Sequence, residues 1–319
     1  MKSSQSTQFI DQRGRQFELL TLTAPDPSAC FADSPFLVPF DGSFNISKYS
    51  TKPPKGAPGE RDSRSARKEI CKGIGEFQDA LYAEDKTGLT VALQGMDAAG
   101  KGGLIRRLTE RITAGGCRVT PFKAPNDLEL DQDFMRRLWP AVATRGMLAF
   151  LDRSHLEEVL VVRVHPEFLK GQRLPHLLKG EEIWNQRFKA IRDIEWHLAH
   201  QGFPMVKIWL HVSKEEQAKR LIDRAQESKK NYKYSERDIS ETMDHWDEYQ
   251  FAAQEALRNL STPWAPCYCI PADQKEFAAL SVAEILYGTL KAIDPQYPSL
   301  SPEEAEGKKR LIERLRTRL

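Results

Sequence analysis

The chain has 319 residues and a formal net charge of +2, with 40% hydrophobic and 29% charged residues. This length is enough to bury a full hydrophobic core. No stretch is long and apolar enough to span a membrane, and the N-terminus lacks the apolar segment of a secretion signal. The five cysteines have no metal-ligand spacing and indicate reduced thiols. We therefore expect a cytoplasmic protein that binds neither membranes nor nucleic acid.

Three regions differ in composition. Residues 1–60 are rich in Pro, Ser, Asp and Gly and predict an irregular N-terminal arm, partly ordered by three aromatic side chains, Phe36, Phe40 and Phe44. Residues 61–295 are expected to form one domain. Residues 296–319 are a highly charged tail with three apolar residues spaced for a helix that docks elsewhere, Leu311, Ile312 and Leu315.

Strand and helix patterns alternate along the central region. Five apolar stretches have the character of strands, namely residues 89–93, 117–122, 147–151, 205–212 and 267–270. Helical spacing predicts helices over residues 66–81, 103–108, 128–138, 184–198 and 275–291. Another helix is expected to begin at Ser213, because Glu216 three residues later completes a capping-box pattern. This alternation predicts an α/β fold with a parallel sheet covered by helices on both faces.

Residues 95–103 read GMDAAGKGG and directly follow the first predicted strand. The spacing G-x-x-x-x-G-K is that of a phosphate-binding P-loop. In such a loop backbone N–H groups surround phosphate oxygens, the next helix adds its positive dipole, and Lys101 supplies a mobile cation. The alternative is a tight glycine turn without a ligand. The predicted phosphate-binding residues are Gly95, Ala98, Ala99, Gly100, Lys101 and Gly102.

The loop lacks the usual metal ligand. Most P-loops have Ser or Thr after the lysine, where the hydroxyl binds Mg²⁺, whereas this chain has Gly102. An acid, Asp97, lies within the loop, where a carboxylate would repel phosphates unless a metal ion lay between them. We therefore expect Asp97 to bind Mg²⁺, with Mn²⁺ as an alternative metal. The competing interpretation is that Asp97 only caps N–H groups of the loop.

A second acid follows the predicted strand 147–151. Ligands of α/β sheets bind beyond the carboxyl ends of the strands, so Asp152 should lie beside the P-loop as a second metal ligand. The next residue, Arg153, adds a permanent cation that can bind phosphate through two N–H groups. His155 is in the same segment, where a hydrogen bond that supports the site is a simpler role than catalysis.

Basic residues are concentrated in two segments. One surrounds the P-loop and includes Arg106, Arg107 and Lys123, which either form a solvated surface or line a groove for a long polyanion. The other extends over residues 219–233. In small phosphotransferases such a segment suits a mobile lid that brings cations over the transferring phosphate, here about residues 214–250.

Five strings occur in a characteristic order and spacing: LQGMDAAGKGG, GCRVTPFKAP, DRSHLEEVLVVRVHP, LHVSKEEQAKRL and APCYCIPAD. They resemble the polyphosphate kinase 2 family over about residues 44–291. The resemblance implies a thymidylate-kinase-like P-loop kinase core with a helical lid. It also implies Mg²⁺-dependent transfer of a terminal phosphoryl group between inorganic polyphosphate and a nucleoside mono- or diphosphate (AMP, ADP, GMP or GDP), by a homodimer or homotetramer.

Motif position and charge together assign roles to residues. The catalytic set is Asp97, Lys101, Asp152, Arg153, Arg220 and Arg224. Beyond the loop itself, the expected polyphosphate-binding residues are Arg106, Arg107, Lys123 and Lys233. The expected nucleotide-binding residues are Arg137, Glu157, Glu158 and Arg163.

The chain departs from the family pattern at several positions. Gly102 and Glu158 stand where Asp is usual, and Leu156 stands where an aromatic ring is usual. The first change bears on metal binding, and the loss of the ring bears on nucleotide placement. Two other functions stay open: an ATP-dependent kinase of a small metabolite, or a catalytically weak polyphosphate-binding protein. Asp97 and Asp152 favour an enzyme, because a pure polyanion binder gains nothing from acids beside phosphates.

Overall fold

The computed structural model describes residues 6–10, 16–20, 31–175, 180–227 and 244–318. Its centre is a five-stranded parallel sheet in the order β4-β5-β3-β6-β7. The strands are β3 (Leu89–Gly95), β4 (Cys117–Pro121), β5 (Leu148–Asp152), β6 (Met205–His211) and β7 (Cys267–Pro271). The expected parallel sheet is therefore confirmed, and the strand that leads into the glycine-rich loop lies at its centre.

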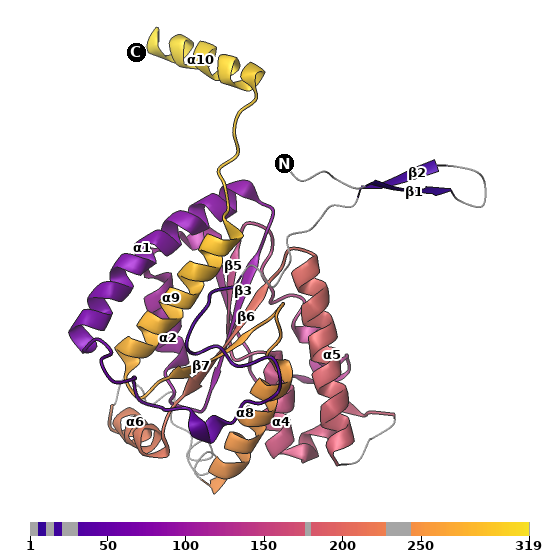
Figure 1. The fold of residues 1–319 in the computed structure, drawn as a ribbon, viewed down its shortest axis with the longest axis vertical. Coiled ribbons are helices and arrows are strands. Elements are labelled where there is room, and N and C mark those ends of the chain that lie inside the picture. The colour runs from indigo at the N-terminus through magenta and orange to yellow at the C-terminus, as the bar shows by residue number, and fades with distance from the viewer. Residues whose placement is uncertain (1–5, 11–15, 21–30, 176–179, 228–243, 319) are drawn as a thin grey trace.

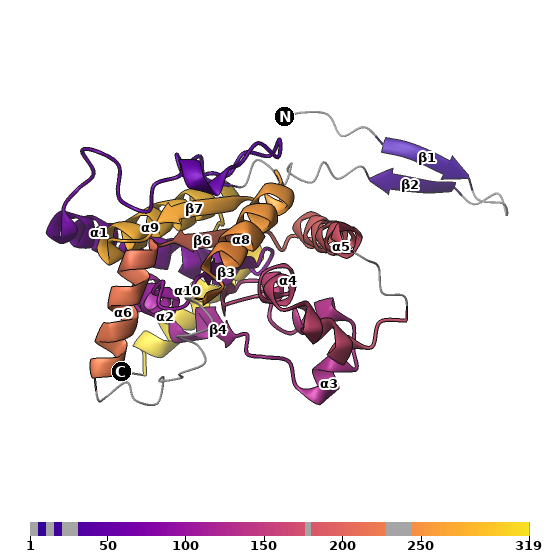
Figure 2. The same ribbon diagram turned by 90° about the horizontal axis from the view of Figure 1, so that it is seen from below.

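Helices cover both faces of the sheet (Figures 1 and 2). On one side lie α1 (Glu60–Glu84), α2 (Lys101–Leu108) and α9 (Lys275–Ile293). On the other lie α4 (Val161–Val164), α5 (Glu181–His200) and α8 (Trp246–Leu260). Helix α6 (Lys214–Gln226) follows β6, and α3 (Asp127–Leu130) lies near α4. Short 3-10 helices span Ile46–Lys48, Thr109–Arg111, Ala114–Gly116, Phe134–Arg137, His155–Val159 and Pro166–Gln172.

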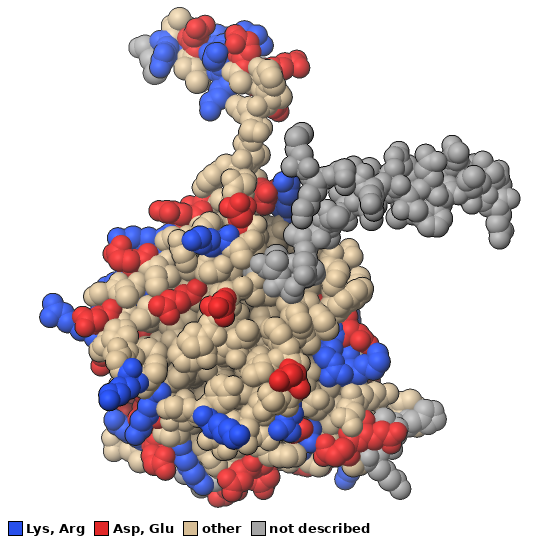
Figure 3. All heavy atoms as spheres, viewed as in Figure 1, with Lys and Arg blue, Asp and Glu red and all other residues tan. Residues whose placement is uncertain are grey.

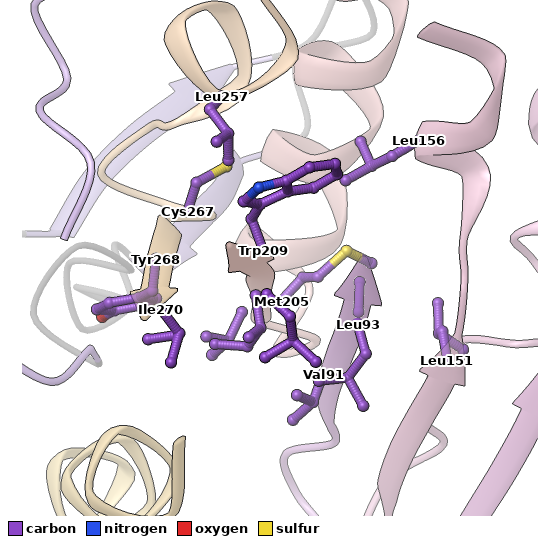
Figure 4. Packing of buried hydrophobic residues seen from close by; sticks show 14 of the residues in the cluster. Val91, Leu93, Leu151, Leu156, Met205, Trp209, Leu257, Cys267, Tyr268 and Ile270 are labelled. Atoms are coloured by element: carbon purple, nitrogen blue, oxygen red, sulfur yellow. The ribbon is translucent and has the colours of Figure 1, made fainter. Parts of the chain in front are cut away.

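The burial of each strand follows its place in the sheet. The apolar strands β3, β5, β6 and β7 are almost wholly buried, as expected for strands covered on both faces. Strand β4 lies at an edge, and its Val119 is 45% exposed. At the opposite edge Leu37 bridges to Tyr268 of β7. Figure 4 shows the core at these strands, where Leu156 lies beside the indole of Trp209.

The N-terminal arm is less irregular than its composition predicts. It contains an antiparallel pair, β1 (Ser6–Ile10) and β2 (Gln16–Leu20), which Figure 1 shows extending away from the main body. Of the three aromatic side chains expected to hold the arm, Phe44 is buried and Phe36 packs on the core, whereas Phe40 is 45% exposed. Two of the three aromatic contacts are therefore made.

The charged tail forms a helix, α10 (Pro302–Arg316). A capping box between Ser301 and Glu304 begins it. Figure 3 shows acidic and basic side chains distributed over this helix, and none of its residues is buried. The tail was expected to dock through its apolar residues, but Leu311 and Leu315 are more than half exposed. None of the helices in the described ranges combines the length and apolar character needed to cross a bilayer.

The helix predicted over residues 128–138 is wrong. The segment forms α3 and then a separate 3-10 helix, Phe134–Arg137. The Asn126 side chain accepts a hydrogen bond from the backbone of Glu129, and the Asp133 side chain accepts one from the backbone of Met135. Each of these side chains caps the start of a separate helix, so two short helices form in place of one continuous helix.

A charged network is fully buried between α5 and β6. Lys207 Nζ donates to Glu195 and, over 2.7 Å, to the carbonyl of Leu260. The other carboxylate oxygen of Glu195 lies 3.1 Å from His155 Nε2. Lys207 and Glu195 are each 1% exposed. This contact gives His155 the supporting role expected from its position.

Candidate active site

The glycine-rich loop begins where β3 meets β6 and ends at the first residue of α2. At Gly95 a side chain would place its Cβ 2.9 Å from the carbonyl oxygen of Leu210, so only glycine permits this approach to β6. Ala98 (φ +61°) and Gly100 (φ +107°) adopt left-handed backbone conformations that turn the chain into the helix. Such a turn directs successive N–H groups toward an anion.

Lys101 is buried against the loop. Its Nζ donates to the carbonyls of Gly95 (2.7 Å) and Met96 (3.2 Å). Burial lowers the pKa of this amine, and the positive charge of Arg153 lowers it further. Bound phosphate would oppose both effects, because a nearby anion favours the protonated amine.

Asp97 and Arg153 form an ion pair at the entrance to the loop. Arg153 Nη2 donates to Asp97, and Arg153 Nη1 lies 3.2 Å from Glu157. Burial disfavours the charged guanidinium, but Glu157 and Asp97 outweigh that effect and raise its pKa. Arg153 also has a left-handed backbone (φ +65°), which follows from the sharp turn at the end of β5.

Asp152 lies at the end of β5, directly opposite Leu93 of β3. A Cβ added at Gly102 would lie 3.8 Å from Asp152 Oδ2, so the carboxylate reaches the first turn of α2. Both Asp152 and Asp97 act electrostatically on Lys101 and Arg153. Mg²⁺ takes one or two carboxylates together with water and phosphate oxygens, and these two acids fit that donor set.

Two of the cavities that contact this loop are lined by different residues of it. One, of about 780 Å³, is lined by Asp97, Arg153 and Glu157 and extends past Phe122 to Phe168. The other, of about 460 Å³, lies over the start of α2 and is lined by Gly100, Gly102, Gly103, Arg106, Arg107 and Lys275. The residues that line this second cavity include three cations and no acid. One cavity therefore reaches the loop at Asp97, and the other reaches it at Gly100 and Gly102.

The larger cavity has a charged wall and an apolar wall. Glu158 accepts from Arg187 (2.7 Å) and Gln172 (2.8 Å). Burial raises the pKa of Glu158, and burial lowers the pKa of Arg187. Arg137 stacks over the ring of Phe122 at 5.1 Å and pairs with Glu129. A wall of this kind suits a ligand with one flat apolar part and several polar groups.

Lys123 and Arg163 lie elsewhere than expected. Lys123, assigned to polyphosphate, lines the larger cavity with Arg137 and Glu158. The guanidinium of Arg163 lies over Phe251 and pairs with Glu181, and it is not among the residues that line that cavity. Arg224 is in the last turn of α6, and Lys233 lies outside the described residues.

Leu156 also differs from its expected role. It is 5% exposed and belongs to the apolar core beside Trp209 (Figure 4), not to the lining of the larger cavity. At this position the chain therefore has a core residue, and the lining of the larger cavity is built from other residues.

Arg220 was expected to close over the reacting phosphate, and the structure places it behind the loop. Its guanidinium donates to the backbone carbonyls of Ala99 (3.0 Å) and Ala272 (2.6 Å). Arg107 likewise has a structural partner, because its Nε lies 3.2 Å from the buried carboxylate of Glu276. Neither partner could be inferred from the sequence, since Glu276 lies 169 residues away in the chain.

A central parallel strand, a P-loop with a buried lysine and two nearby carboxylates define a P-loop phosphotransferase. The family model of polyphosphate kinase 2 (PPK2) matches residues 59–298. The chain belongs to this family of polyphosphate-dependent nucleotide phosphotransferases.

Relatives and a solved structure support the assignment. The chain is 38% identical over 230 residues to the ADP-polyphosphate phosphotransferase of Rhodopseudomonas palustris. This alignment covers 72% of this chain and 79% of the relative. It is 35% identical to the AMP/ADP-polyphosphate phosphotransferase of Meiothermus ruber over 84% of this chain and 96% of the relative. The crystal structure of polyphosphate kinase 2 from Arthrobacter aurescens superposes with a TM-score of 0.79 at 32% identity, covering 89% of this chain and 98% of that one.

Gly102→Asp should lower the Mg²⁺ concentration that gives half-maximal rate. The position has a helical backbone and accepts a Cβ at an ordinary contact distance, and its new carboxylate would lie near Asp152, where added acids recruit a hard cation. Titration of Mg²⁺ against initial rate in both proteins measures the effect. Gly102→Asn, similar in size but uncharged, is the control. An equal or higher Mg²⁺ requirement in Gly102→Asp would disprove this role for the position.

Proposed function

We propose that this protein transfers the terminal phosphoryl group between inorganic polyphosphate and a nucleoside mono- or diphosphate, with Mg²⁺ as metal and Mn²⁺ as an alternative. The observation that carries the proposal is the pair of cavities that meet at one P-loop. The cationic cavity over α2 suits a polyphosphate chain, and the larger cavity suits a nucleotide with its base near Phe122. The names of the relatives, which include ADP- and AMP/ADP-polyphosphate phosphotransferases, support the same pair of substrates.

In this mechanism the protein positions groups and neutralises charge. Mg²⁺ supplies charge neutralisation on the phosphate oxygens when it is bound. Asp97 and Asp152 would hold it, and Lys101 would bind the transferring phosphate from within the loop. Arg153 would exchange its bond to Asp97 for phosphate oxygens. No side chain has to act as a covalent nucleophile, because phosphoryl transfer needs little beyond alignment and electrostatics.

Incubation of the protein with polyphosphate, Mg²⁺ and a panel of AMP, ADP, GMP and GDP tests the function, with products separated by chromatography. Formation of the next higher nucleotide with any acceptor supports the proposal. Transfer only from ATP to another metabolite would favour a metabolite kinase, and binding of polyphosphate without product would favour a pure binding protein.

We also propose that the active enzyme is a homo-oligomer in the cytoplasm.

Arg106→Ala and Lys123→Ala should affect different substrates. Arg106 lines the cationic cavity and Lys123 lines the larger one, so we expect the first to raise KM for polyphosphate and the second to raise KM for the nucleotide. Each loss should be about 10- to 100-fold, since a charge-assisted contact contributes about 1.5–3 kcal/mol. The polyphosphate KM should also rise with salt, less steeply in Arg106→Ala. Arg106 is preferred to Arg107 because Arg107 also pairs with Glu276.

The two variants serve as controls for each other. Both remove one cation from a wall of the site, so a general electrostatic loss would raise both KM values in both proteins. The reverse assignment, with Arg106→Ala weakening only the nucleotide, would show that the donor and acceptor cavities have been exchanged in the proposal.

A further inference from the structure

The carbonyl groups of the P-loop are held by donors on two sides. On the inner side, Lys101 Nζ donates to Gly95 and Met96. Next along the loop, the carbonyl of Asp97 accepts from Gln217 Nε2 at 2.9 Å. The next two carbonyls, on residues 98 and 99, accept from Arg220 Nη1 at 3.5 and 3.0 Å. Two side chains of α6 thus bind the part of the loop that Lys101 does not.

Arg220 also connects the loop to the wall of the cationic cavity. Its Nη2 donates to the carbonyls of Ala272 (2.6 Å) and Asp273 (2.9 Å), just before α9. Its Nε donates to Glu216 at 2.8 Å, so all three guanidinium nitrogens have partners. The residue is 5% exposed. With all of these hydrogen bonds, the guanidinium bridges two backbone segments. A single ammonium group cannot reproduce its planar arrangement of donors.

We propose that Gln217 and Arg220 are positioning residues that fix the shape of the P-loop from behind. Donors that hold the carbonyls of residues 97–99 outward leave the N–H groups on the opposite side for phosphate. The bridge from Arg220 to residues 272 and 273 sets the distance between the loop and Ala272, and both line the cationic cavity. This inference rests on the proposed function, because it concerns the same phosphate site.

Arg220→Lys and Gln217→Leu test the proposal in the full-length protein. We expect each to lower kcat by about 10- to 100-fold, since a displacement near 1 Å can cost about that much, with little change in either KM. Gln217→Leu is suited to the test because Gln217 Oε1 is buried without a hydrogen-bond partner, so leucine removes an unsatisfied acceptor along with the donor. Lys189→Gln, which removes an exposed cation of α5 that lines neither cavity, should retain the wild-type rate.

Three results would each overturn the inference. Full activity in Arg220→Lys would show that charge alone matters, and full activity in Gln217→Leu would show that the loop needs no support from α6. A double variant whose rate loss is the product of the two single losses would show that the residues do not act on one loop.

Hydrogen exchange of residues 95–103 should rise in both single variants while exchange in β6 stays unchanged. Equal rises throughout the protein would indicate a general loss of stability and would also overturn the inference. Absence of polyphosphate turnover in the wild type would instead refute the proposed function.

Discussion

Asp152→Asn and Asp97→Asn should each lower kcat by about 10²–10³-fold or more, because a bound metal contributes several kcal/mol of transition-state stabilisation and each 1.36 kcal/mol is tenfold in rate. The double variant should lose little more than the worse single variant, since both acids are proposed to bind one ion. Steady-state rates over a range of Mg²⁺ concentrations measure the losses. Excess Mg²⁺ should partly restore each single variant.

The two acids differ in one respect that the same experiment can resolve. Asp97 is paired with Arg153, so Asp97→Asn also releases a guanidinium that can then bind phosphate more strongly. We therefore expect Asp97→Asn to retain or improve nucleotide affinity while it loses rate. Asp62→Asn, an exposed acid in the first turn of α1, is the control for a change of net charge. Independent losses that multiply in the double variant would count against a shared metal.

The fold could be predicted because a strand that is buried on both faces has an apolar sequence. Strands β3, β5 and β6 are covered on both faces, and their continuous apolar runs identify them without any partner. The broken helix after residue 126 could not be predicted in the same way. Its apolar spacing fits a continuous helix, and the outcome is decided by two local caps, Asn126 and Asp133, each worth about 1 kcal/mol.

The part of the site that lies at strand ends was also accessible to sequence reasoning. These residues lie at or just after the carboxyl ends of two neighbouring parallel strands, β3 and β5, which bring them to one edge of the sheet: Asp97, Lys101, Asp152 and Arg153. On helices, the charge of a residue says much less about whether that residue binds a ligand. Arg106 and Arg220 look alike in the sequence, yet one lines a cavity and the other binds backbone carbonyls. Nothing in helical spacing tells a ligand-binding cation from a structural one.

Several arginines near the cationic cavity are paired with one buried acid. Arg107, Arg67 and Arg64 all lie within 3.7 Å of Glu276, a buried acid in the first turn of α9. An acid at that position is favoured by the helix dipole, and it compensates part of the positive charge that lies behind the cavity. Of the cations that line the cavity, Arg107 is therefore also bound to the protein itself.

Lys207→Met should lower the free energy of unfolding by about 3–5 kcal/mol, because it leaves the buried Glu195 carboxylate without its cation. The double variant Lys207→Met with Glu195→Gln should recover most of that loss, since the neutral amide keeps a hydrogen bond to His155 and no charge stays buried. Denaturant unfolding followed by circular dichroism measures both. The matched control is Lys189→Met, which breaks an exposed ion pair to Asp193 on the same helix and should cost less than about 1 kcal/mol.

The comparison separates two explanations of the buried network. If Lys207 contributes mainly apolar packing, methionine replaces it at little cost, and Lys207→Met should resemble Lys189→Met. If the pair is held by charge, the single variant must be worse than the double, because desolvation of an unpaired carboxylate exceeds the loss of the pair itself. His155 ties this network to the segment that carries Asp152 and Arg153, so the single variant should also lower kcat while the double variant retains it. A double variant less stable than Lys207→Met would show that the charge pair is not what holds α5 to β6.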